Sequence, residues 1–267
     1  MRTKKAGCRP RWTILPQMFL DLPAPQILAI LATYIFAATT KGITGLGFST
    51  TCLPILALIV GLKDALPLVI ITSVCSNLIV MRQVGRFRET LTRFWPMLVA
   101  LFPGLAAGLW VLSWIDGEDA GAFLGGILLL WCLFSLAKPD FRLSAACERP
   151  LAPLSGLLTG TINGVTGSQV MPVVPFLMML RLERPLFIQA VNCSFTLSSF
   201  IMAIGLGSLG LISRDDIVIS SLGACVVFIG LRIGGAIRHR LSEDLFRMGA
   251  TAMQMLMGLS LIFPALV

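Results

Sequence analysis

Two short polar stretches interrupt an otherwise apolar chain and hold the side chains best suited to chemistry. The first is Lys41-Gly42-Ile43-Thr44-Gly45, and the second is Asn163-Gly164-Val165-Thr166-Gly167. Besides Arg232, Lys41 is the one ionisable residue well inside an apolar segment. A charge at membrane depth is expensive, so Lys41 should face a polar cavity or an anionic partner. The alternative is that Lys41 lies at the tip of a re-entrant segment, where water in a vestibule hydrates its charge.

A new half-helix should begin after each stretch, near Ser49 and near Gln169. Helix starts present unpaired N–H groups and partial positive charge, which suits an anion, and glycines let the backbone bend and approach a ligand. Together the lysine, hydroxyls, amides and glycines form a candidate oxyanion site: Lys41, Gly42, Thr44, Gly45, Gly47, Ser49, Asn163, Gly164, Thr166, Gly167, Ser168 and Gln169. The competing interpretation is that these polar groups only satisfy backbone groups freed at the kinks.

Other polar residues extend or limit this chemistry. Asn77 and Asn192 lie in corresponding apolar segments and could line a pathway or lock helices together. No Asp or Glu lies within an apolar segment, which disfavours a proton relay through a buried carboxylate. The single histidine, His239, sits in a charged loop and no CxxC pair exists, so we expect neither a metal site nor a cofactor.

Composition places these stretches in a membrane. The chain is 56% hydrophobic and 13% charged, far below the charge of a soluble domain. Apolar segments recur along it, several long enough to cross the hydrocarbon core as helices, and no alternating barrel pattern is present. They run approximately 27–40, 46–62, 65–81, 94–115, 120–137, 151–165, 169–180, 186–211, 217–236 and 247–266.

The two polar stretches also reveal an internal repeat. They align with each other, and Gly104-Leu-Ala-Ala-Gly108 matches Gly230-Leu-Arg-Ile-Gly234 at a similar offset of about 120 residues. Each half then reads as a broken pair, two short helices neither of which comfortably spans a membrane, followed by three full spans. The predicted fold is an all-α polytopic helical bundle of two inverted repeats. Its parts are a basic extension (1–24), the first repeat (25–140), a cytoplasmic linker (141–150) and the second repeat (151–267).

The net charge of +8 does not indicate nucleic acid, because Lys and Arg lie in short loops between apolar segments. By the positive-inside rule, the loops with Arg82 to Arg93, Lys138 to Arg149, Arg181 to Arg184 and Arg238 to Arg247 should be cytoplasmic. The loops around Glu118 and Asp215 should face outward. This topology puts the start of the first repeat outside, against the five positive charges of the N-terminal tail. Either the tail is translocated, or the first pair makes an uneven number of crossings.

At these segments the sequence resembles a known family. KGITGLGFSTTCLPILAL and GLLTGTINGVTGSQVMPVVPFLMML look like the paired signatures of the TauE/SafE sulfite exporters, and the closing RLSEDLFRMGATAMQMLMGLSLI also fits. The resemblance implies a multi-pass carrier of the bacterial inner membrane for sulfite, sulfonates or related organosulfur and carboxylate anions. It also implies a substrate region at Lys41–Ser49 and Asn163–Gln169. Lys41 departs from the family pattern, where we expect a neutral residue.

Two other function classes compete with an anion transporter. A membrane-embedded enzyme lacks support, because the sequence has no GxSxG, no HExxH and no intramembrane Asp pair. A passive anion channel or a structural subunit of a membrane complex stays open. The expected partners are a small anion and the lipid bilayer, with no nucleic acid, and a homo-oligomer stays open as well.

Overall fold

The computed structural model describes residues 24–137, 142–237 and 243–266, and every regular element in these ranges is an α-helix. The helices are α1 (Ala24–Thr44), α2 (Phe48–Val60), α3 (Leu62–Val84), α4 (Phe87–Leu112), α5 (Gly117–Ala137), α6 (Ala145–Thr166), α7 (Val173–Met179), α8 (Arg184–Ser208), α9 (Arg214–Ile237) and α10 (Glu243–Leu266). Six of them, α1, α3, α4, α5, α8 and α9, are long and apolar enough to cross a membrane. The prediction of an all-α, polytopic membrane bundle is confirmed.

Some expectations fall outside the described residues. These are the basic N-terminal extension up to residue 23, His239, and parts of the two loops expected at 138–149 and 238–247. The division of the chain into an extension, two repeats and a linker stays a prediction. Helix α6 begins at Ala145, inside the stretch assigned to the linker.

The first break is shorter than the sequence suggested. Helix α1 continues through Lys41 to Thr44 and ends where Gly45 and Gly47 take φ values of 82° and 95°, a left-handed conformation that glycine adopts without strain. With 21 residues, α1 is long enough to span, so the prediction that neither member of the pair spans is wrong for α1. Helix α2 then starts at Phe48, one residue before the predicted start, and has 13 residues.

The second break is longer. Helix α6 ends at Thr166, and the following Gly167 has a φ of 73° and donates its N–H to the Asn163 carbonyl at 2.7 Å. Residues 167–172 are not helical, and α7 begins at Val173. The prediction of a helix start near Gln169 is therefore wrong by about one turn. Pro172 explains the shift, because a residue without an N–H is best tolerated where a helix begins.

Each half packs its small-residue motif against the broken helix of the other half. On α4, a Cβ added at Gly104 would lie 2.2 Å from the Leu157 carbonyl oxygen of α6. On α9, a Cβ added at Gly230 would lie 2.9 Å from the Ile35 carbonyl oxygen of α1. In the repeat alignment that pairs Lys41 with Asn163, Ile35 pairs with Leu157. The two interfaces are therefore equivalent.

One turn further along, the equivalence repeats. A Cβ added at Gly108 would lie 2.7 Å from the Cα of Gly164, and one at Gly234 would lie 2.8 Å from the Cα of Gly42. The contacts advance in the same direction on both partners, so α6 runs parallel to α4, and α1 runs parallel to α9. Such close backbone approach through small residues is typical of helix packing in membranes.

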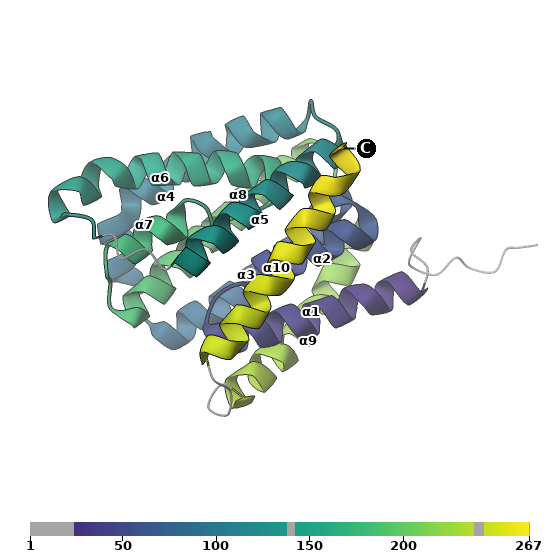
Figure 1. Cartoon of the computed structure of the whole chain (residues 1–267), viewed down its shortest axis with the longest axis horizontal. Helices are drawn as coiled ribbons and strands as arrows, with labels where there is room; N and C mark the ends of the chain where they lie inside the picture. Colours follow the sequence, from purple (N-terminus) through teal and green to yellow (C-terminus); the bar gives the residue numbers. More distant parts are fainter. Residues whose placement is uncertain (1–23, 138–141, 238–242, 267) are drawn as a thin grey trace, which may run out of the picture.

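The equivalent helices α5 and α10 pack against each other in opposite directions. A Cβ at Gly125 would lie 2.5 Å from the Gly258 carbonyl oxygen, while the Cys132 thiol lies 3.5 Å from the Thr251 carbonyl oxygen. Residue numbers thus rise on α5 as they fall on α10, which is the antiparallel relation that an inverted repeat requires. Figure 1 shows α4 beside α6 along the top, α1 beside α9 along the bottom, and α5 and α10 at the front between them.

Candidate functional site

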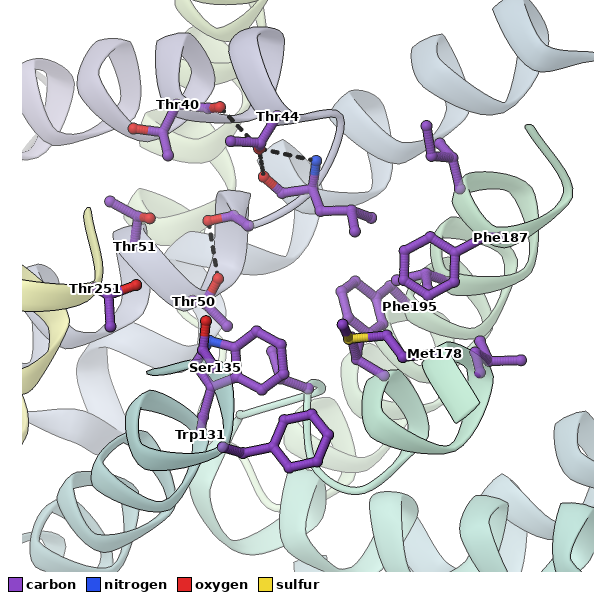
Figure 2. A pocket seen from close by; sticks show the side chains of 18 of the residues that line it. Thr40, Thr44, Thr50, Thr51, Trp131, Ser135, Met178, Phe187, Phe195 and Thr251 are labelled. Atoms are coloured by element: carbon purple, nitrogen blue, oxygen red, sulfur yellow. Dashed lines mark hydrogen bonds between the residues drawn. The ribbon is translucent and has the colours of Figure 1, made fainter. Parts of the chain in front are cut away.

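The first turn of α2 and the second break separate two cavities. The larger one, here called the vestibule, has a volume of about 670 Å³. Hydroxyl-bearing residues of α1 and α2 lie on one side of it, and aromatic residues of α5 and α8 face them (Figure 2). Its lining includes Thr40, Thr44, Gly47, Thr50, Thr51, Trp131, Phe134, Val170, Met178, Arg181, Arg184, Phe187, Phe195 and Gln254.

The smaller one, here called the inner cavity, brings residues from both breaks together. Its volume is about 20 Å³, enough for about one water molecule. Neighbouring residues face different cavities: Ser49 and Gln169 line the inner cavity, whereas Thr50 and Val170 line the vestibule. The complete inner lining is Ser49, Leu53, Leu66, Val69, Ile70, Ser73, Asn163, Gly167, Gln169, Ser199 and Met202.

Each break is tied by a hydrogen bond to the next helix of its own half. The Ser49 and Ser73 hydroxyl oxygens lie 2.9 Å apart, which joins the start of α2 to α3. In the second half, the Gln169 side-chain amide donates to the Ser199 hydroxyl of α8 at 3.1 Å. All four side chains are buried, and each of them lines the inner cavity. The inner cavity is therefore a meeting point of polar groups from both halves.

Several polar atoms around the second break have no hydrogen-bond partner in the described part of the chain. They are both side-chain amide atoms of Asn163, the Gln169 side-chain oxygen and the Ser168 hydroxyl. Leaving a buried polar group unpaired costs about 1–3 kcal/mol, so these groups call for water or a ligand. Because Asn163 and Gln169 line the inner cavity, a polar occupant there could bond to them.

Two threonines of the candidate set use their hydroxyls on the kinks themselves. Thr44 donates to the Thr40 carbonyl at 3.0 Å and accepts from the Leu46 N–H at 3.2 Å. Thr166, its repeat equivalent, donates to the Ile162 carbonyl at 2.7 Å and accepts from the Ser168 N–H at 3.1 Å. For Thr44 and Thr166, these hydrogen bonds agree with the interpretation that the polar side chains satisfy backbone groups freed at the kinks.

Lys41 lies outside the lining of both cavities. Its side chain is 2% exposed and reaches α3, where it donates to the Ser76 hydroxyl at 3.1 Å and to the Asn77 side-chain oxygen. Ser76 and Asn77 lie one helical turn beyond Ser73 on the same face of α3, which places the ammonium group one turn from the inner cavity. Among the described residues, no carboxylate forms an ion pair with Lys41.

The remaining candidates take other positions. Gly42 and Gly164 lie in close contacts between helices. A Cβ added at Gly42, for example, would lie 2.7 Å from the Leu231 carbonyl oxygen of α9. Gly45 lies against Ile188, while Gly47 lines the vestibule. Asn192 donates to the backbone carbonyl of Ile188 at 2.8 Å and lines neither cavity.

Sequence reasoning did not find every polar residue of the inner cavity. Ser73 and Ser199 were missed, although Ser73, Ser76 and Asn77 have the i, i+3, i+4 spacing of a polar stripe on one face of an apolar helix. The vestibule aromatics gave no comparable signal, because Trp and Phe are common on lipid-facing surfaces.

The comparison with family models agrees with this architecture. The model described as Sulfite exporter TauE/SafE matches residues 30–261, a range that contains both breaks and both glycine motifs. Searches of the curated proteins and of the solved structures gave no match. The match covers most of the chain, from within α1 to within α10. The protein therefore belongs to the TauE/SafE family of sulfite exporters, a family of membrane transporters.

Proposed function

We propose that the protein is a carrier that exports small anions, such as sulfite, sulfonates or related organosulfur compounds, across a bacterial inner membrane. In this proposal two inverted repeats each contribute one helix break to a shared site near the membrane midplane. The observation that carries it is the inner cavity, which Ser49 lines from the first half, and Asn163, Gly167 and Gln169 from the second.

The electrostatics around the inner cavity support an anion rather than a cation. The start of α2 adds backbone N–H groups and the positive end of a helix dipole, since Ser49 lies in its first turn. Hydroxyls and the Asn163 amide can donate hydrogen bonds, and no described carboxylate lines the cavity. Lys41 adds a positive charge one turn away along α3, held by neutral partners that leave the charge itself uncompensated.

A carrier fits the size of the inner cavity better than an open channel. Room for about one water is too little for sulfite, so the two breaks must move apart to admit an anion. The vestibule supplies the approach, and its lining includes the exposed Arg181 and Arg184 at the connection between α7 and α8, which the positive-inside rule assigns to the cytoplasm. A vestibule that opens to the cytoplasm is the state expected of an exporter that is ready to bind its substrate.

The proposal is tested by reconstituting the full chain in liposomes and following labelled sulfite and methanesulfonate across the membrane. Gln169→Leu removes a polar group of the inner cavity with little change in volume, and we expect it to lower flux about tenfold. Gln83→Leu, on an exposed residue at the end of α3, is the matched control and should leave flux unchanged.

Two results would contradict the proposal. Liposomes holding folded wild-type protein that pass neither anion faster than protein-free liposomes would remove the transport function. Equal flux in Gln169→Leu and Gln83→Leu would remove the inner cavity from the pathway. Discrete single-channel currents in planar bilayers would favour the passive channel instead.

A further inference from the structure

We infer that Gln254 of α10 is a positioning residue for anion transport, because it holds the first turn of α2 in place through the backbone carbonyl of Thr50. The side-chain amide of Gln254 donates to this carbonyl at 3.4 Å, across 204 positions of the sequence, and both residues are buried. The inference rests on the proposed transport of anions, and it adds to that function a residue that lies outside both breaks.

The Thr50 carbonyl needs a donor from outside α2 because of Pro54. In an α-helix the carbonyl of one residue accepts the N–H of the residue four positions later. For Thr50 that residue is Pro54, which lies inside α2 and has no N–H. A buried carbonyl without a partner is costly. Gln254 therefore supplies, from another helix, the hydrogen bond that the proline removes.

The first turn of α2 places side chains in both cavities. Ser49 lines the inner cavity, whereas Thr50 and Thr51 line the vestibule together with Gln254. Figure 2 shows Thr251, one turn before Gln254 on α10, on the same side of the vestibule as Thr50 and Thr51. Because the three residues of α2 are consecutive in one turn, a shift of that turn would displace all of them. The position of the Thr50 backbone thus decides how both cavities are lined.

Helix α10 gives this contact a fixed support. A Cβ added at Gly258, one turn after Gln254, would lie 3.0 Å from the Gly125 carbonyl oxygen of α5. One turn before Gln254, the Thr251 carbonyl oxygen lies 3.5 Å from the Cys132 thiol of α5. Gln254 therefore lies between two close contacts of α10 with α5. Its hydrogen bond ties the first turn of α2 to this pair of helices.

The second half has no equivalent of the contact. The glycine alignment that pairs Gly104 with Gly230 pairs Gln254 with Leu128, which is 1% exposed and cannot donate a hydrogen bond. Helix α7 also needs no such donor, because the residue four positions before its Pro175 lies ahead of the helix start. A general packing requirement of the fold would apply to both halves. The contact instead serves the proline of α2.

The test is a double-mutant cycle on the flux of labelled methanesulfonate in liposomes. Gln254→Met removes the amide and keeps the length of the side chain, so we expect KM to rise about fivefold while the maximal rate changes by less than about twofold. In a Pro54→Ala background the restored backbone N–H at position 54 can donate to the Thr50 carbonyl. There, Gln254→Met should change KM by less than about twofold.

The pattern across the cycle separates positioning from a merely structural role. Loss of folded protein would lower the maximal rate and leave KM unchanged. Gln83→Met, on an exposed residue at the end of α3, is the matched control and should leave KM unchanged. If Gln254→Met does not fold, Gln254→Asn takes its place, because its amide is one methylene too short to reach the carbonyl. An equal rise of KM in both backgrounds, or no rise in either, would overturn the inference.

Thermal denaturation in detergent tests the same contact without transport. We expect Gln254→Met to lower the melting temperature by about 2–4 °C in the wild-type background and by less than about 1 °C in the Pro54→Ala background. Equal losses would overturn the inference and leave anion transport intact. Unequal losses without any anion flux would remove the transport proposal instead, and would leave the contact of Gln254 with the Thr50 carbonyl in place.

Discussion

Lys41 on α1 donates a hydrogen bond to the side-chain oxygen of Asn77 on α3. The ammonium group is thereby held by dipoles, those of Asn77 and Ser76, and by no described carboxylate. Hydrogen bonds from neutral groups orient a charge without neutralising it. In the proposed site, a protonated Lys41 would place a positive potential beside the inner cavity, which would favour an incoming anion.

Replacing Lys41 with methionine tests the role of this charge. Lys41→Met keeps most of the side-chain volume and removes the positive charge, so we expect anion flux in liposomes to fall about tenfold with the fold retained. Arg232→Ala is the control, because that residue is exposed, its guanidinium lies 5.2 Å from the centre of the Phe228 ring, and it lines neither cavity. Small and equal effects of both variants would show that Lys41 takes no part in transport.

The equivalent glycine contacts predict equal losses of stability in the two halves. Gly42→Ala and Gly164→Ala each add a methyl group where the partner backbone leaves no room, 2.7 Å from the nearest atom in either case. We expect each to lower the free energy of unfolding by about 1–3 kcal/mol, measured by thermal denaturation in detergent. Gly126→Ala is the control, since nothing lies within 4 Å of its added Cβ. A loss confined to one of the two variants would contradict the equivalence of the interfaces.

Labelling of single cysteines tests the orientation of the bundle. In a cysteine-free background, Glu118→Cys in the first turn of α5 should react with a membrane-impermeant maleimide in intact cells. Gln83→Cys, at the end of α3, should react only after the membrane is permeabilised. Both residues are exposed, so accessibility within the protein does not limit the reaction. The reversed pattern would invert the topology, and with it the side on which the vestibule opens.

The ion pair between α4 and α6 should contribute little. Arg93 binds Glu148 through two hydrogen bonds of 2.7 and 2.8 Å, and the arginine side chain is 40% exposed. Partly exposed pairs of this kind are worth about 0–1 kcal/mol and weaken as salt is added. Glu148→Gln should therefore shift the unfolding temperature less than Gly164→Ala does, and less at high salt. A shift as large as that of Gly164→Ala would mean that the pair holds the two helices together.

The sequence predicted the helices well because lipid leaves the backbone few alternatives. The ten predicted apolar segments correspond to the ten helices of the described residues, and the glycine motifs that indicated a repeat form contacts between the two halves. The breaks were harder to place. Lys41 and Gly42 looked like the kink itself, yet both are helical, because a lysine can reach neutral partners on another helix and a glycine can serve packing.

The polar side chains of the site could be predicted better than their partners. Which of them meet depends on how α3 and α8 lie against the breaks, which no local pattern encodes. Ser73 and Ser199 became visible only through their bonds to Ser49 and Gln169. The start of α7, in contrast, had a local signal in Pro172, since proline favours the beginning of a helix.

Helix α2 has a glycine at each end, Gly47 with φ of 95° and Gly61 with φ of 87°, whereas its counterpart α7 is 7 residues long and is preceded by Pro172. Glycine joints rotate easily and a proline joint does not. We therefore expect the first half to move more than the second half when the two breaks move apart to admit an anion. The two strokes of a transport cycle would then follow different energy profiles, although the sequences of the two breaks align.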